Sequence, residues 1–253
     1  MREGARFAKL FLFSPREAAD ACKSESSLRP GLVVYGVLFV VQLYCAWFDP
    51  LSYINANAPV RIAHGAGFWL KVAMAEPVMF LFSVLFVGVI VEWMRGGWLP
   101  LKIASTALWT LLPIGLAMHF ISNKSFHRAY YLPVLLVWAL PVPLLSRAVT
   151  RERWALLLRF MLGLNAIQLA ATAVQFATVV PAHSQRGYTA LVFASLVWTL
   201  WAGGVGISRL FELKTLRAGV AFFYALFAIL TVPAMAFIFS LLPEEVLKVL
   251  LFG

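Results

Sequence analysis

The chain has 253 residues, of which 62% are apolar and only 13% are charged, and its formal net charge is +10. A soluble domain carries about 25% charged residues, and a soluble fold of this size could not bury so much apolar surface. The positive charge does not indicate a nucleic-acid binder, because the basic residues lie at the ends of apolar segments and in the amino-terminal tail. Topology and anionic headgroups favour them there.

Seven apolar segments organise the sequence. Most are long enough to cross a hydrocarbon core of about 30 Å, which takes roughly 20 helical residues. We therefore expect an all-α polytopic transmembrane bundle that occupies residues 31–253 as one domain, after a lead-in at residues 1–30. The seven predicted spans are 31–48, 68–93, 101–121, 130–146, 154–180, 188–208 and 218–242.

Positive charge alternates between the loops that join these segments. Most of the 21 Lys and Arg residues fall in the tail and in every second loop. Because basic loops stay on the cytoplasmic side, the amino terminus is predicted in the cytoplasm and the carboxyl terminus outside. No cleavable signal peptide is expected, since the first segment follows a polar and basic stretch. We expect an integral protein of a bacterial inner (plasma) membrane.

The lead-in alternates aromatic and basic residues, which is typical of a short helix that lies at the membrane interface with its cations toward lipid phosphates. Ser14-Pro15-Arg16-Glu17 then predicts a second helix, because Ser and Glu satisfy free backbone donors and Pro has none to lose. We expect this helix to run from Pro15 to about Leu28. The lead-in either anchors the chain or docks a partner, through Arg2, Arg6, Phe7, Lys9 and Phe11.

Glu76 is the candidate ionisable residue inside the membrane, where a charge costs roughly 2.5–3.5 kcal/mol. It is either a proton or cation site open to the outer face, or an interfacial carboxylate that pairs with Lys71 or caps a helix starting at Pro77. In the second case residues 67–75 form an interfacial or re-entrant stub. The fourth segment carries Pro133, Pro141 and Pro143, and is expected to be kinked, broken or a half-span.

The fifth segment carries a polar face formed by Asn165, Gln168, Thr172 and Gln175, which recur at helical spacing. In lipid such side chains either bond to neighbouring helices or line a wet path. In the sixth segment, Gly203, Gly204 and Gly206 indicate close backbone approach to a neighbour.

Signatures of catalysis are missing from the sequence. It contains no HExxH or GxSxG, and its four histidines and two cysteines show no zinc-ligand spacing. Cys22 and Cys45 are expected to be free thiols. We predict no catalytic residue, no cofactor and no metal.

Two stretches resemble the Yip1 domain family of small polytopic membrane proteins. They are the lead-in from Leu10 to Glu17, and the end of the chain from Trp198 through Gly206 and Arg209 to the span after Arg217. The resemblance implies a cytoplasmic amino terminus, an odd number of spans and an outer carboxyl terminus. Eukaryotic members of that family act in vesicle trafficking with small GTPases. The family usually has five spans where this sequence predicts seven, and no functional residue is transferred from it.

Three functions remain open from the sequence. The first is a non-enzymatic scaffold, subunit or lipid-interacting factor, whose partners are membrane lipids and either other proteins or further copies of itself. The second is a transporter or channel with a polar path along the fifth span and Glu76 as its coupling site. The third is an intramembrane enzyme that modifies lipid.

Overall fold

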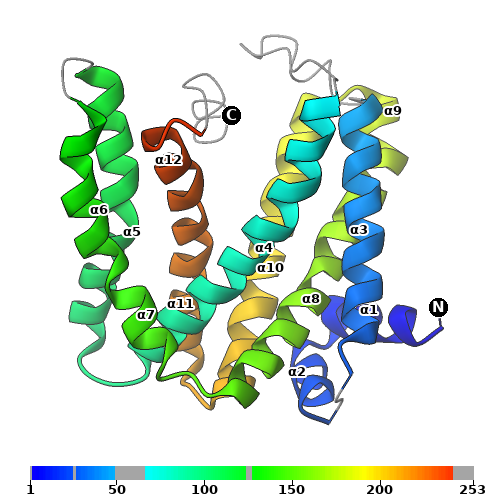
Figure 1. The fold of residues 1–253 in the computed structure, drawn as a ribbon. Coiled ribbons are helices and arrows are strands. Elements are labelled where there is room, and N and C mark those ends of the chain that lie inside the picture. Colours follow the sequence, from blue (N-terminus) through cyan, green and yellow to red (C-terminus); the bar gives the residue numbers. More distant parts are fainter. Residues whose placement is uncertain (1, 25–26, 49–65, 124–126, 242–253) are drawn as a thin grey trace. The chain divides into compact units, whose positions relative to one another are not determined.

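The computed structural model describes residues 2–24, 27–48, 66–123 and 127–241, and in these ranges every regular element is helical (Figure 1). The all-α prediction is therefore confirmed for the described chain. Residues 49–67, between the first two predicted segments, fall largely outside these ranges, and of the seventh segment only residue 242 does. The chain divides into two compact units. Unit 1 takes in Met1–Asn57, His64–Glu76 and Arg151–Gly219, and unit 2 takes in Ala58–Ala63, Pro77–Thr150 and Val220–Gly253.

Six helical stretches of the described chain are long and apolar enough to cross a membrane, which is the character of a membrane-integral protein. They overlap the second to seventh predicted segments, and the first of them begins at Glu76, later than the predicted residue 68. The stretches are Glu76–Met94, Leu99–Ser122, Ala129–Ser146, Arg151–Ala182, Gln185–Phe211 and Thr215–Ile238.

Unit 1 is built around contacts of α3 with α8 and of α8 with α10, and the two amino-terminal helices α1 and α2 lie against α8. Helix α2 ends at Ser24, before the predicted Leu28, and Arg29-Pro30 opens α3 instead of ending α2. Pro has no backbone donor to lose in the first turn of a helix, so it is tolerated there. The helices of this unit are α1 (Arg2–Phe13), α2 (Pro15–Ser24), α3 (Arg29–Phe48), α8 (Arg151–Val174) and α10 (Gln185–Phe211).

Glycines let large side chains and backbones approach closely in unit 1. A methyl group at Gly163 would overlap the ring of Phe11, and one at Gly206 would overlap the ring of Phe160. A Cβ at Gly204 would lie 3.0 Å from Cα of Gly219. The close approach predicted for the glycines of the sixth segment is confirmed for Gly204 and Gly206, and it joins α10 to α8 and to the start of α11 (Thr215–Ile229).

The end of the fifth segment changes its helical winding. Helix α8 passes into η2 (Gln175–Val179), a π-helical turn, and then into the short α9 (Val180–Ala182). Pro181 offers no N–H to the carbonyl of Ala177, so an α-helical ladder cannot continue through it. Val180 N–H instead donates to the carbonyl of Gln175, which is π-helical pairing.

Unit 2 contains the part of α4 (Ala66–Met94) that follows Glu76, the part of α11 that follows Gly219, and α12 (Thr231–Ile238), which packs against α5 (Leu99–Ser122). The fourth segment is interrupted at Leu140, before Pro141, as its prolines predicted. It consists of η1 (Arg128–Tyr131), α6 (Leu132–Ala139) and α7 (Pro141–Ser146). A core cluster joins α5, α6 and α12 through Ala117, Tyr131, Leu135, Ala234, Phe237 and Ile238.

In unit 2, the indole N–H of each of two tryptophans donates a hydrogen bond to the backbone carbonyl of the other. Trp109 Nε1 donates to the carbonyl of Trp138 at 2.8 Å, and Trp138 Nε1 donates to the carbonyl of Trp109 at 2.7 Å. The Trp109 carbonyl needs this donor, because Pro113, four residues on, has no N–H. The Trp138 carbonyl lies in the last turn of α6, where helical donors run out. The stacked rings, 5.0 Å between centroids, therefore join α5 to α6.

Candidate functional site

Helices α1 and α2 form an amino-terminal cap, residues 2–24, on unit 1. Helix α1 buries the stripe that contains Phe7 and Phe11, with exposed fractions of 9% and 0%, and Phe11 packs against Phe160 of α8. Arg6 and Lys9 lie on the opposite, exposed face. An amphipathic helix with this pattern rests on apolar neighbours and turns its cations outward.

This placement corrects one sequence prediction. Phe7 and Phe11 were expected to contact the membrane surface or a partner, but the chain itself covers them, because α8 offers Gly163 as a notch for the Phe11 ring. Among the described side chains, Arg6 and Lys9 remain exposed and open to such contacts. The side chain of Arg2 lies outside the described residues.

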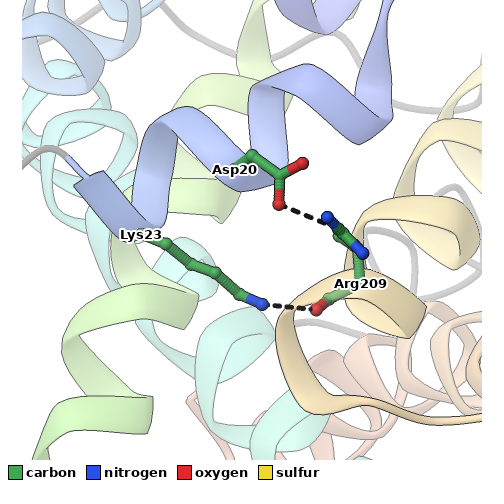
Figure 2. Close-up of polar contacts among 3 residues, drawn as sticks. All are labelled: Asp20, Lys23 and Arg209. Carbon is green, nitrogen blue, oxygen red and sulfur yellow. Dashed lines mark hydrogen bonds and ion pairs between the residues drawn. The ribbon is translucent and has the colours of Figure 1, made fainter.

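Helix α2 is tied to the end of α10 by two polar contacts, shown in Figure 2. The Arg209 guanidinium donates from Nε to Asp20 Oδ1 at 2.8 Å. Lys23 Nζ donates to the backbone carbonyl of Arg209 at 2.9 Å. Helix α10 ends two residues later, so this carbonyl belongs to the last turn, where a cation also meets the negative end of the helix.

Arg159 of α8 caps α2 in the same way. Its guanidinium donates to the carbonyl of Cys22 at 3.1 Å, within the last turn of α2. Lys23 of α2 therefore caps α10, while Arg159 of α8 caps α2. These contacts could not be predicted from the sequence for Arg159, Lys23 or Arg209. The partner of each residue is far away in the chain, and no local spacing of residues indicates it.

The pKa values of Asp20 and Cys22, two of the ionisable groups of α2, are shifted by these surroundings. The hydrogen bond from Arg209 lowers the pKa of Asp20 below its ordinary value. Burial raises the pKa of the Cys22 thiol to about 12, although the nearby Arg159 acts against this rise. Cys22 is fully buried and is a free thiol, as predicted. Its thiolate is unavailable at neutral pH, so it is not a reactive cysteine.

A cavity of about 480 Å³ opens between α2, α10 and the start of α11. Charges of both signs line it. Glu212 lies in the left-handed region with φ 56°, at the helix end where glycine is usual. The Oγ of Ser208 donates to the carbonyl of Leu213 at 2.7 Å, which closes the turn beneath it. The lining residues are Arg16, Asp20, Val205, Ser208, Arg209, Glu212 and Thr215.

Two of the four residues on the polar face predicted for the fifth segment bond to their own helix. Asn165 Nδ2 donates to the carbonyls of Met161 and Leu162, and Thr172 Oγ1 donates to the carbonyl of Gln168. The Gln168 side chain is exposed. Gln175 begins the π-helical turn that Pro181 explains. The local bonds of Asn165 and Thr172 are an alternative to bonds with a neighbouring helix. The role of the four-residue face as packing contact or wet path stays a prediction.

Glu76 lies half-buried within α4 and is the last residue of this helix that belongs to unit 1. The helix continues through Pro77 without ending, so Glu76 does not cap a helix that starts there. The alternative that the span begins near Pro77, after an interfacial stretch at residues 67–75, stays a prediction; the apolar stretch of membrane-spanning length in α4 begins at Glu76. The side chain of Lys71, its proposed partner, lies outside the described residues.

Comparison with models of protein families, with curated proteins and with solved structures finds no match to this chain.

Proposed function

We propose that this protein is a non-enzymatic, lipid-interacting factor of the membrane, and that its amino-terminal cap presents a basic face to anionic headgroups. The observation that carries the proposal is the division of α1 into two faces. Phe7 and Phe11 are buried by the chain itself, so Arg6 and Lys9 face outward at the end of the bundle. A basic, outward helix face next to apolar spans attracts anionic lipids.

We also propose seven spans, with the amino terminus in the cytoplasm and the carboxyl terminus outside, in a bacterial inner membrane. Helix α3 is the first of these spans in chain order and is counted in addition to the six long apolar stretches. Its 20 residues form a helix about 30 Å long. Contacts in unit 1 support the topology: Asp20 meets Arg209, and Arg159 meets the carbonyl of Cys22. The tail and the two basic ends that the charge pattern assigns to one side therefore lie together.

The cap also supports a role as scaffold or subunit. Its exposed basic face and the charged cavity beside α2 are surfaces on which a protein partner or a second copy of the chain can dock. Two short helices ahead of the first span agree with the proposed kinship with the Yip1 domain family. We propose no nucleic-acid partner.

The proposal is tested by thermal unfolding of the purified protein in lipid nanodiscs. Discs of phosphatidylcholine alone are compared with discs that also contain phosphatidylglycerol. We expect the anionic lipid to stabilise the wild type, and the paired change Arg6→Gln with Lys9→Gln to remove about 1 kcal/mol per cation of that gain.

The matched control is Arg6→Lys with Lys9→Arg, which keeps both charges and should keep the gain. If the glutamine variant gains as much from phosphatidylglycerol as the wild type, the cap does not act through anionic lipid.

A further inference from the structure

Unit 2 contains a second cavity, of about 240 Å³, which is separate from the cap. It lies between α4, α5 and α7, near the turn that joins α4 to α5. Helix α7 reaches it because the fourth segment breaks before Pro141. The lining residues are Val89, Ile90, Trp93, Ser105, Thr106, Trp109, Pro141 and Leu145.

The two hydroxyls of this lining are already engaged. Ser105 Oγ donates to the carbonyl of Lys102 at 3.0 Å, and Thr106 Oγ1 donates to the same carbonyl at 2.7 Å. The indole N–H of Trp109 is engaged by the Trp138 carbonyl. The cavity therefore presents carbon to whatever fills it.

Water is a poor occupant for such a space. The volume equals that of roughly eight waters at ~30 Å³ each, and each buried water needs two to four polar partners. Each hydroxyl has donated its proton to the Lys102 carbonyl and keeps only acceptor capacity, and the Trp109 N–H is already bound, so these groups offer too few polar partners for about eight waters. The cavity belongs to three apolar stretches of membrane-spanning length, so a lipid hydrocarbon chain is the apolar group at hand.

A cation marks one edge of the cavity. Lys102 Nζ lies 3.2 Å from the centroid of the Trp93 ring, which is part of the lining. Gly97, with φ 80°, leaves room for the stem of this lysine, since a Cβ there would lie 3.2 Å from Lys102 Cε. An ammonium held beside an apolar cavity is complementary to a phosphate joined to an acyl chain.

We propose that this cavity binds an acyl chain of an anionic phospholipid, with the lipid phosphate paired to Lys102. The inference rests on the proposed membrane role, but it places a specific lipid site in unit 2, on residues that are not part of the cap. Trp109 closes the cavity on one side, because its hydrogen bonds with Trp138 and its edge-to-face contact with Phe86, 5.9 Å between centroids, hold the indole in place.

The test uses phosphatidylglycerol with a photoreactive diazirine in its acyl chain, incorporated into nanodiscs with the full-length protein. After irradiation, the labelled residues are mapped by mass spectrometry. We expect labelling of the cavity lining, and labelling from phosphatidylcholine with the same diazirine should be weaker. Lys102→Gln should lower the phosphatidylglycerol labelling about fivefold and the phosphatidylcholine labelling much less, because the choline cation offsets the charge of the phosphate.

Ser105→Phe should abolish labelling, because the ring fills the cavity. The matched control is Ala104→Phe, which places the same ring on the neighbouring exposed position and should leave labelling intact. The Lys102→Gln comparison keeps the proposal testable if Ser105→Phe fails to fold.

Equal labelling by the two lipids, or labelling spread evenly over the spans, would overturn the inference. The cap variant Arg6→Gln with Lys9→Gln should not change labelling of the cavity. If that variant loses the stability gained from phosphatidylglycerol while the cavity is still labelled, the cap and the cavity bind lipid independently. If the cavity is unlabelled in the wild type while phosphatidylglycerol still stabilises the protein through the cap, only the cavity site is wrong.

Discussion

Asp20 and Arg209 are 189 residues apart in the sequence, and their side chains form an ion pair with 2.8 Å between Oδ1 and Nε. The pair joins a helix that precedes the spans to the end of the sixth predicted span. Both side chains are about half-exposed, with exposed fractions of 46% for Asp20 and 59% for Arg209, so solvent screens their attraction. The role of the pair is to fix where the cap sits.

Removal of the pair should loosen the cap more than it unfolds the bundle. We expect Asp20→Asn and Arg209→Gln each to speed protease cleavage within residues 2–24, while the double variant cleaves no faster than either single variant. Limited proteolysis in mild detergent measures this. Additive effects of the two changes would show that the residues act independently.

The ion pair should also depend on pH. The pKa of Asp20 is lowered in the folded protein, so the pair stabilises the cap above the ordinary pKa of 3.8. This stabilisation is lost as pH falls below 3.8 and through the folded value, because protonation removes the charge. Cleavage of the wild-type cap should therefore accelerate in this acid range relative to its own rate at pH 7, and Asp20→Asn should show no such change. An acid-resistant protease is needed.

The notch at Gly163 makes a steric prediction. Gly163→Ala should destabilise the protein by about 1–3 kcal/mol, because the new methyl group overlaps the Phe11 ring. Phe11→Leu should make room for this methyl group. The double variant should therefore lose less stability than the sum of the losses of the two single variants. Thermal unfolding measures the effect, with Gly36→Ala as control, since a methyl at Gly36 meets nothing within 4 Å. No coupling between residues 11 and 163 would contradict the packing of α1.

The sequence alone could predict the helical class and the positions of the apolar stretches, because length and hydropathy decide these locally. It could also predict the break before Pro141 and the close approach at Gly204. It could not tell that Phe11 turns into the chain instead of toward lipid, since the notch that receives it is 152 residues away at Gly163. The partners of Lys23 and Arg159 were hidden for the same reason.

The tryptophan pair predicts a specific loss in unit 2. Trp138→Phe keeps an aromatic ring but leaves the Trp109 carbonyl without its donor, because Pro113 cannot replace it. An unsatisfied carbonyl in an apolar setting costs about 1–3 kcal/mol, so the melting temperature should fall. Trp201→Phe, at an exposed position, serves as the control and should have little effect. Equal stability of the two variants would contradict the assigned role of the pair.

The buried thiol predicts low reactivity. In a Cys45→Ser background, Cys22 should react with maleimide at pH 8 far more slowly than a free thiol, and at the full rate after denaturation. The folded pKa of about 12 lies above the unfolded value of about 8.5, so the folded thiol stays protonated. By linkage, folding stability should fall as pH rises above about 8.5, and Cys22→Ala should remove that part of the loss. Fast labelling of the folded protein would contradict this burial.

The most direct test of the central claim is the depth of α1 in a bilayer. Spin labels at Ala5 and Phe13, on the exposed face of α1, are measured in anionic liposomes in a background with Cys22→Ala and Cys45→Ser. Power saturation with oxygen and with a soluble nickel chelate reports the depth of each label. The account predicts both labels at the level of the headgroups, with Phe13 the more accessible to oxygen. Accessibility to the nickel chelate equal to that of a label free in water, at both positions, would contradict it.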